Sequence, residues 1–238
     1  MKLPTLLYTA IILSCAACTN KTAEFSAVHL KDTVTVAPVK DTVIVKDSTI
    51  TKERLYDNLS YTHNYKLTYL EHYKGKEDPD THYWTITVYD KNMKPVDSIV
   101  QPVFMYFAGL IDFSTARSYL TGVNRDKQVA DNYAGDFIVA DFNFDNKNDF
   151  AIINDMGGNG GTFYSYYLQQ DKDKYVEDRF LTDSVTYFPA INKANRTLTT
   201  LVHAWSCGNS EDIYTLQGAK WKHTGHRLIN NCKDKKKK

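Results

Sequence analysis

The stretch Asp141-Phe142-Asn143-Phe144-Asp145-Asn146-Lys147-Asn148-Asp149 decides how the rest of this chain can be interpreted. Oxygen-bearing side chains occupy its first, third, fifth and ninth positions. Calcium takes roughly six to eight oxygen ligands, so a short loop that binds it must turn carboxylates and carbonyls inward together. Alternate positions allow this, and a backbone carbonyl at the seventh position would add a ligand. The stretch therefore predicts a Ca²⁺ loop whose ligands are Asp141, Asn143, Asp145, Lys147 and Asp149.

Short apolar runs flank this stretch, Ile138–Ala140 before it and Phe150–Ile153 after it. They predict buried strands and not the helices of an EF-hand, and Ile152 stands where an EF-hand requires Glu. We therefore expect a calcium-type turn within a β-hairpin. Asn146 takes the place of the usual bend-forming Gly, and Asn tolerates the left-handed conformation. The alternative is a polar turn without a metal, because Asp and Asn also favour turns.

Strand-like segments recur on both sides of the loop, separated by turn-forming Asp, Asn, Lys and Gly. The 17 Tyr, 11 Phe and 3 Trp suit strands with packed aromatic faces. We therefore predict an all-β domain over residues 61–232, an antiparallel meander that forms a β-sandwich or a propeller-like sheet. The expected strands are 65–70, 83–89, 96–107, 138–140, 150–153, 162–169, 185–191, 197–205, 213–216 and a last one from 221 onward, with a short helical turn at 114–120.

The N-terminus has the pattern of an export signal. Met1-Lys2 precedes a mostly apolar run, Leu3–Leu13, which is too short to span a bilayer. The cysteines that follow resemble those of a bacterial lipobox, in which the cysteine is lipidated and becomes the mature N-terminus. Cys15 has an aliphatic residue three positions before it and is preferred; Cys18 is the alternative, and cleavage without lipidation is a third. We predict a lipoprotein signal peptide over residues 1–18 and a lipid-anchored protein of the bacterial cell envelope, periplasmic or on the outer-membrane surface.

Residues 19–60 are charged and rich in Thr and Val, with no aromatic residue between Phe25 and Tyr56. Such a segment buries too little apolar surface to form a core, so we expect a flexible tether. A single edge strand around Thr42–Val45 is the alternative. Residues 233–238 end the chain in a basic run, which is expected to be a solvated tail. The net charge of +1 gives no indication of a nucleic-acid partner.

The four cysteines divide by location. Cys15 and Cys18 belong to the signal, which leaves Cys207 and Cys232 in the folded region. In an oxidising compartment these two are expected to form a disulfide, with free thiols as the alternative.

The folded part of the sequence lacks catalytic motifs: there is no HExxH or GxSxG pattern, and the CxxC spacing of Cys15 and Cys18 lies within the predicted signal. The run Gly157–Gly161 lacks the Lys that a phosphate-binding loop needs and reads as a mobile loop between strands. His203 lies within a strand-like segment and is interpreted as a structural histidine. We therefore expect no enzyme activity and no catalytic residues.

The Asp141–Asp149 stretch with its flanks looks like the calcium loops of FG-GAP and VCBS-type repeats on bacterial surface proteins. Residues 135–221 resemble a family of periplasmic bacterial lipoproteins that carry a single such loop in a compact β domain. Some members are similar to lysozyme inhibitors and act as immunity proteins against secreted peptidoglycan hydrolases. The segments that carry this resemblance are Asp141–Asp145, Asp149–Ile152, the glycine run, Tyr164–Leu168 and Ser206–Gly208.

Two functions follow as hypotheses. The first is a membrane-anchored, calcium-stabilised, non-enzymatic binding protein, an inhibitor of a lysozyme-like hydrolase that uses loops at Gly157–Thr162 and Gly208–Asp212. The alternative is a calcium-stabilised surface module that binds glycans through exposed Tyr and Trp. A row of exposed aromatic side chains would favour glycan binding, whereas a protruding loop would favour inhibition.

Overall fold

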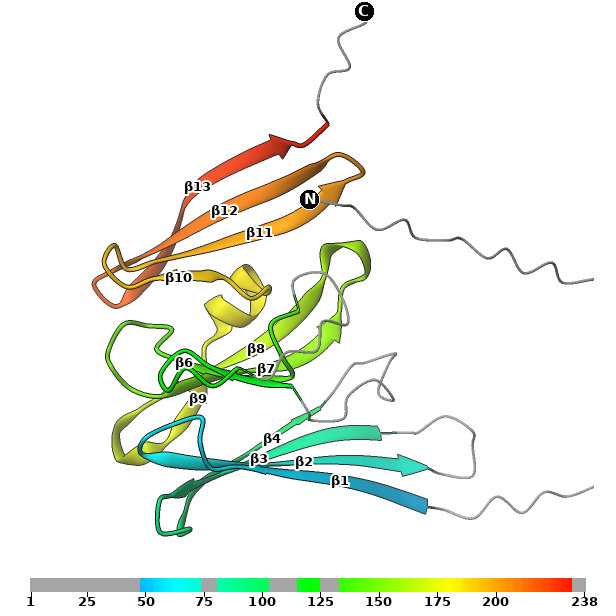
Figure 1. Cartoon of the computed structure of the whole chain (residues 1–238), viewed down its shortest axis with the longest axis vertical. Helices are drawn as coiled ribbons and strands as arrows, with labels where there is room; N and C mark the ends of the chain where they lie inside the picture. The colour runs from blue at the N-terminus through cyan, green and yellow to red at the C-terminus, as the bar shows by residue number, and fades with distance from the viewer. Residues whose placement is uncertain (1–47, 74–80, 103–114, 125–132, 233–238) are drawn as a thin grey trace, which may run out of the picture. The chain divides into compact units, whose positions relative to one another are not determined.

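The computed structural model describes residues 48–73, 81–102, 115–124 and 133–232, all within the compact unit Val43–Lys238. Three sheets of four, five and four strands follow one another along this part of the chain, and each contains strands that are consecutive in sequence. Figure 1 shows the three sheets one above another. The described chain is all-β, as the sequence predicted, and sheets that face one another are consistent with a sandwich.

The first sheet is antiparallel throughout, in the order β1-β2-β3-β4. Buried side chains alternate with more exposed ones along its central strands. Tyr65, Leu67 and Tyr69 of β2 are buried, and so are Trp84, Ile86 and Val88 of β3. This period of two places one face of the sheet against the neighbouring layer. The strands are β1 (Ser48–Tyr56), β2 (His63–Tyr73), β3 (Thr81–Asp90) and β4 (Pro95–Pro102).

The central sheet is buried on both faces. All four residues of β6 and the first five of β7 are buried, with no alternation. Such a pattern needs protein on each side, which the other two sheets supply (Figure 1). The pairing is antiparallel except between the first two strands, which run parallel. The strands are β5 (Ala116–Ser118), β6 (Phe137–Ala140), β7 (Asp149–Met156), β8 (Thr162–Gln169) and β9 (Tyr175–Glu177).

The third sheet packs on the rest through one part of its surface only. Leu198 and Thr200 of β11 are buried, whereas Leu201, His203 and Trp205 further along the same strand are exposed. All of its pairs are antiparallel. The strands are β10 (Ala190–Asn192), β11 (Thr197–Trp205), β12 (Gly208–Gln217) and β13 (Lys220–Asn230), and the short helical segments are η2 (Gly158–Gly160), η3 (Asp171–Asp173) and η4 (Leu181–Val185).

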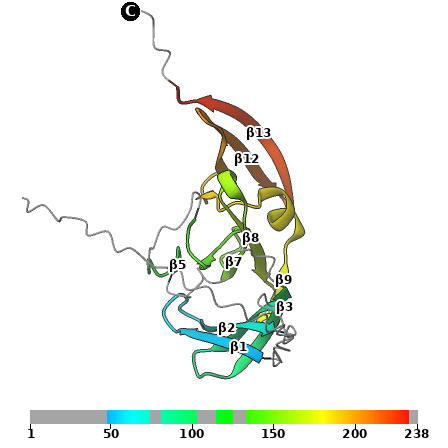
Figure 2. The same cartoon turned by 90° about the vertical axis from the view of Figure 1, so that its right-hand side faces the viewer.

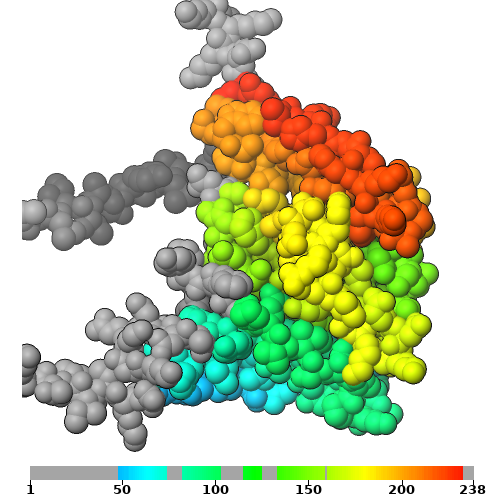
Figure 3. All heavy atoms as spheres, turned by 180° about the vertical axis from the view of Figure 1, so that it is seen from behind, coloured from blue at the N-terminus to red at the C-terminus, as the bar shows by residue number. Residues whose placement is uncertain are grey.

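Aromatic side chains join the layers. Between the first two sheets, the ring of Phe137 lies 5.3 Å from that of Tyr65 and 5.1 Å from that of Phe150. Below the third sheet, Phe180 packs against Tyr214 and Trp221. Figure 2 shows η4 beside β12 and β13, and Figure 3 shows the yellow segment that includes η4 in the middle of the rear face.

Three expectations from the sequence are corrected. Residues 48–56, expected at the end of the tether, form β1, an edge strand in which most side chains are exposed, the apolar Ile50 and Leu55 among them. Within the described part of 114–120, Ala116–Ser118 form strand β5, because they pair with β6, and the expected turn lies after it, where the Gly122 N–H donates to the Ser118 carbonyl at 3.1 Å. The expected strand at 185–191 is replaced by the end of η4 and by β10, and Thr186 between them has a φ of 59°.

The predicted signal peptide with Cys15 and Cys18, most of the tether and the basic tail lie outside the described residues. Among the residues that are described, no helix is long and apolar enough to cross a membrane.

Candidate metal centre

The predicted calcium stretch connects two antiparallel strands of the central sheet. Ala140 at the end of β6 pairs with Asp149 at the start of β7, so the intervening residues form the hairpin loop that the sequence predicted. Two loop residues, Phe144 and Asn146, have positive φ values of 61° and 65°. Asn146 therefore adopts the left-handed conformation expected where a Gly usually stands.

Three carboxylates converge inside this loop. Ligand oxygens of Asp141, Asp145 and Asp149 all lie within 4.8 Å of one another. Asp145 is exposed to solvent, whereas the other two are buried. Backbone N–H groups hold the carboxylates in place: Asp141 accepts from Asp145 at 2.9 Å and from Asn146 at 3.1 Å.

The other two predicted ligands lie in the same loop. The Asn143 side chain is next to the carboxylates, because its amide nitrogen donates to Asp145 Oδ2 at 3.1 Å. For Lys147 the structure gives the backbone N–H, which donates to Asp145 Oδ1 at 2.9 Å. Its Nζ points to Asp171 at 3.2 Å. The role of the Lys147 carbonyl as a metal ligand stays a prediction.

Asp149 is the residue on which the electrostatics of the loop depends. Its side chain is fully buried, with 0% exposure. Burial raises the pKa of Asp149 to about 8, and the neighbouring Asp145 and Asp141 contribute in the same direction. The hydrogen bonds from the N–H groups of Gln169 and Phe142 lower the pKa, but they do not outweigh burial. A charged Asp149 next to two other carboxylates needs a positive partner.

A calcium ion fits this donor set. Oxygen atoms of three carboxylates and an amide are what a hard divalent cation requires. A positively charged side chain does reach the rim of the loop, since Lys193 Nζ lies 3.3 Å from Asp141 Oδ2 and 2.7 Å from Asn146 Oδ1. The contacts of Lys193 do not include the buried Asp149 carboxylate.

Residues at both outer sheets contact the Asp141–Asp149 loop. Asn148 donates to Thr62 Oγ1, just before β2, at 2.6 Å, and its backbone N–H donates to Gln169 Oε1 of β8 at 2.7 Å. On the other side the Phe144 ring packs on Trp221 of β13 with centroids 6.0 Å apart. The loop is therefore an element of the packing between sheets as well as a turn.

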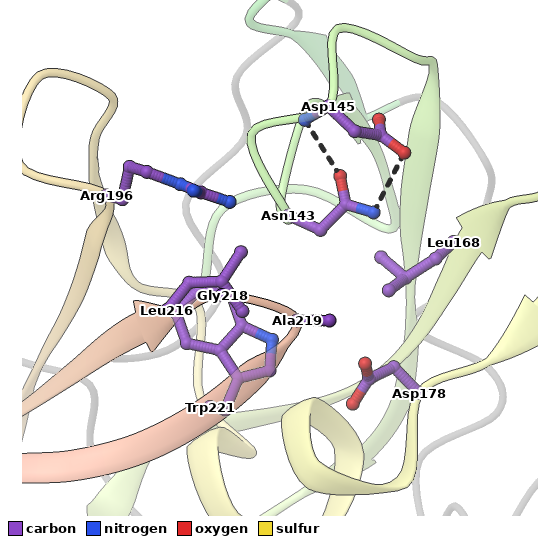
Figure 4. Close-up of a pocket in the computed structure, with 9 residues that line it drawn as sticks. All are labelled: Asn143, Asp145, Leu168, Asp178, Arg196, Leu216, Gly218, Ala219 and Trp221. Atoms are coloured by element: carbon purple, nitrogen blue, oxygen red, sulfur yellow. Dashed lines mark hydrogen bonds between the residues drawn. The ribbon is translucent and has the colours of Figure 1, made fainter.

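A pocket of about 220 Å³ adjoins the loop, and two of the loop side chains form part of its wall. Figure 4 shows Arg196 and Asp178 reaching toward it from different sides, with the Trp221 ring between them. No sequence motif pointed to any of these three residues. Asp178 follows β9, Arg196 precedes β11 and Trp221 lies in β13, so no local sequence pattern connects them. The lining residues are Asn143, Asp145, Leu168, Asp178, Arg196, Leu216, Gly218, Ala219 and Trp221.

Of the two segments that were expected to be loops and to contact a partner, one is a strand and the other is a turn. Gly208–Asp212 is not a loop, because it forms the first half of β12 and pairs with both β11 and β13. Gly157–Gly161 is a turn between β7 and β8 that contains η2. It is closed by its own backbone, with the Gly157 N–H donating to the Gly161 carbonyl at 2.6 Å.

Cys207 and Cys232 are paired as a disulfide, with their Cα atoms 5.1 Å apart. The bond links the β11–β12 turn to the residues that follow β13, so it closes the outer end of the third sheet.

Comparisons with known proteins add little to this site. Neither a family model nor a curated protein matches the chain. One similar solved structure is that of a Xanthomonas protein related to the type IV secretion system, with 17% identity and a TM-score of 0.49 over 78% of this chain and 88% of that one. A similarity this low does not bear on function. The molecule is thus defined by its own features, as an all-β protein with a carboxylate-lined hairpin loop beside a pocket.

Proposed function

We propose that this chain is a calcium-stabilised, non-enzymatic binding protein, held at the bacterial cell envelope by an N-terminal lipid. The observation that supports the calcium site is the fully buried Asp149 carboxylate, with Asp141 and Asp145 oxygens inside the same 4.8 Å cluster. Calcium held by oxygen ligands is redox-inert, so its role here is to fix the loop and the sheets that contact it.

For the ligand we propose a glycan, bound in the pocket beside the loop. A sugar ring has an apolar face that stacks on an aromatic ring and hydroxyl groups that bond to charged and amide side chains. Trp221 supplies the ring, and Arg196, Asp178 and Asn143 supply the polar groups. Because Asn143 and Asp145 belong to the metal loop as well, calcium would order one wall of the pocket.

The exposed aromatic side chains give less support to stacking on a flat surface. The four exposed large aromatic residues of the described chain are Tyr61, Tyr83, Tyr119 and Trp205. Tyr83 lies in β3, Trp205 lies in β11, and the other two lie outside the strands, so they do not follow one strand. The pocket is for this reason the better candidate for a glycan.

A thermal melt of the full chain tests the calcium site. We expect calcium to raise the midpoint relative to EGTA, with about 2.7 kcal/mol of added stability at one hundred times the dissociation constant. Asp145→Ala should remove this response. Asp171→Ala is the matched control, because Asp171 is a neighbouring exposed acid outside the cluster, with a side-chain exposure of 97%. Coincident curves with calcium and with EGTA would reject the metal site.

Titration with soluble glycan fragments of peptidoglycan, followed by calorimetry, tests the pocket. Trp221→Ala should weaken binding, and Arg196→Asn should do so without removing a packed ring, since Asn tolerates the φ of 53° at this position. Trp205→Ala, an exposed Trp away from the pocket, is the control. If both pocket variants bind like the wild type, the glycan is not held there.

Inhibition of a peptidoglycan hydrolase is a second candidate function. The close packing of side chains on the Gly157–Gly161 turn favours it. Phe163 and Tyr187 pack so closely on Gly157 and Gly160 that a Cβ at either glycine would meet a ring atom or hydroxyl within 2.6 Å. A turn already shaped in this way would lose little conformational entropy on entering an active-site cleft. Lysozyme-like hydrolases assayed with the wild type and with Gly160→Ala test this: inhibition by the wild type should be lost in the variant, and no inhibition at all rejects the candidate.

A further inference from the structure

Strand β13 contains a bulge that places two histidines on the same face. Ile213 pairs with Gly225 and Tyr214 pairs with His223, so Thr224 is an extra residue without a partner in the register. The Thr224 hydroxyl lies 2.8 Å from Thr215 Oγ1 and donates to the Ile213 carbonyl at 3.3 Å. Residues three apart in a regular strand point to opposite faces. Because Thr224 is an extra residue, His223 and His226 point to the same face of the sheet.

Asp212 of the neighbouring strand lies between these histidines. His226 pairs directly with Asp212 in the register, and Nδ1 of His226 and Nε2 of His223 lie 2.8 and 2.9 Å from the same atom, Asp212 Oδ1. The other carboxylate oxygen accepts a hydrogen bond from Ser210 Oγ at 3.0 Å. Burial raises the pKa of Asp212, but the hydrogen bonds from His226, Ser210 and His223 outweigh it, so the pKa is lowered and the carboxylate is ionised at neutral pH.

The surroundings hold this arrangement while leaving it open to solvent. The His223 ring packs on Tyr214 with centroids 5.1 Å apart, and the Tyr214 hydroxyl is fixed by the Ser184 carbonyl at 2.9 Å. The side-chain exposures of His223 and His226 are 48% and 51%. An ion in solution can therefore reach both imidazoles.

We propose that Asp212, His223 and His226 form a binding site for a divalent transition-metal ion such as zinc, separate from the calcium loop. Two imidazole nitrogens and a carboxylate are a donor set that suits zinc and copper, whereas calcium takes oxygen ligands only. Ser210 orients the carboxylate from outside the ligand set, as groups around metal ligands usually do. Three protein ligands leave one tetrahedral position for water or for a side chain of a partner.

Metal binding requires the two rings to turn toward each other, because Asp141, Asp145 and Asp149 are the group whose ligand atoms already lie within 4.8 Å of one another in the described residues. Tetrahedral zinc with bonds of about 2.0 Å separates its ligand atoms by roughly 3.3 Å. The imidazole centroids are now 6.4 Å apart, with Asp212 Oδ1 bonded to both rings. Rotation of the two half-exposed side chains would let an ion take the place of the hydrogen bonds.

Zinc titration of the full chain by calorimetry, in saturating calcium, tests the site. We expect His226→Ala and Asp212→Asn to weaken zinc binding by at least about tenfold. His203→Ala is the matched control, because His203 is an exposed histidine on the same sheet outside the cluster. Cobalt absorption in the visible range should report nitrogen ligation in the wild type and lose that signal in His226→Ala.

The proposal is overturned if the wild-type chain takes up no zinc, or if His203→Ala weakens uptake as much as His226→Ala does. It is overturned as well if Asp145→Ala alone abolishes zinc binding, because the ion would then occupy the calcium loop. None of these results changes the outcome of the calcium melt, so the two metal sites are tested separately.

Discussion

The Oδ1 atom of Asp149 accepts a hydrogen bond of 2.9 Å from the backbone N–H of Gln169. The side chain of Gln169 bonds to the loop as well: its Oε1 accepts from the N–H of Asn148, the residue before Asp149, at 2.7 Å. The metal loop and strand β8 are thus joined by a reciprocal pair of bonds. Asp149 therefore contributes to the structure in two ways, as the buried ligand of the proposed ion and as the acceptor for backbone groups.

Asp149→Ala should destabilise the protein even without calcium. The substitution leaves the N–H groups of Gln169 and Phe142, which now donate at 2.9 and 2.8 Å, without an acceptor. Buried donors of this kind cost about 1 to 3 kcal/mol each. Urea unfolding in EGTA measures the loss. A midpoint equal to that of the wild type would mean that Asp149 acts only through the ion.

Without calcium, the stability should fall as the pH rises from about 4 to about 8. The pKa of Asp149 is raised from 3.8 to about 8 in the folded chain, so the folded state keeps a proton that the unfolded state has released. The stabilisation by the protonated Asp149 is complete below the unfolded-state pKa of 3.8 and is lost as the pH rises through the folded-state pKa of about 8.

Asp149→Asn is the control for this pH dependence. It resembles the neutral acid and should show a flatter profile than the wild type in urea unfolding without calcium. Saturating calcium should also remove the loss in the wild type, because the ion replaces the proton. Parallel profiles for the wild type and for Asp149→Asn would contradict the assignment to Asp149.

Asn146 should tolerate Gly but not Val. Its φ of 65° suits Gly, and a β-branched side chain in this conformation costs at least about 1 kcal/mol. We expect Asn146→Gly to stay within about 0.5 kcal/mol of the wild type, since it loses only the exposed contact to Lys193. Asn146→Val should lower both the melting midpoint and the calcium response. Equal behaviour of the two variants would argue against a strained bend in the loop.

Removal of the disulfide should destabilise the protein by about 3 to 4 kcal/mol on the chain-entropy estimate, because the two cysteines are 25 residues apart. The double variant Cys207→Ala, Cys232→Ala is compared with the wild type by urea unfolding, with and without a reductant. Reductant should affect only the wild type. If reductant leaves both proteins unchanged, the bond adds nothing to stability.

Much of the central sheet was predictable because its signal is local. Residues 137–140 and 150–153 are continuously apolar because both faces of β6 and β7 are covered, and the predicted strand 162–169 has the same ends as β8. In the third sheet, the predicted strand 197–205 has the same ends as β11. Strand β1 was missed for the opposite reason. It is an edge strand that exposes most of its side chains, so its sequence looks like that of a tether.

The hairpin loop Asp141–Asp149 and its carboxylate cluster were predictable within their own nine residues, whereas the groups around them were not. Spacing places Asp141 and Asp145 together because they share one turn. It carries no information on Lys193, which bonds to Asn146 from 47 residues further along the chain, or on Trp221, whose ring packs on Phe144. The β13 bulge was equally hidden, since only the register with β12 reveals it.

The contacts of Asn148 with Thr62 and of Phe144 with Trp221 give the proposed ion an influence on all three sheets. A chain that closes fully only when calcium is present would fold according to its compartment. In the cytoplasm, where free calcium is scarce, such a chain would stay loosely closed and remain competent for export. Under the proposed export and calcium binding, calcium outside the inner membrane would then complete the fold after translocation, and one nine-residue loop would separate the secretion of the polypeptide from its maturation.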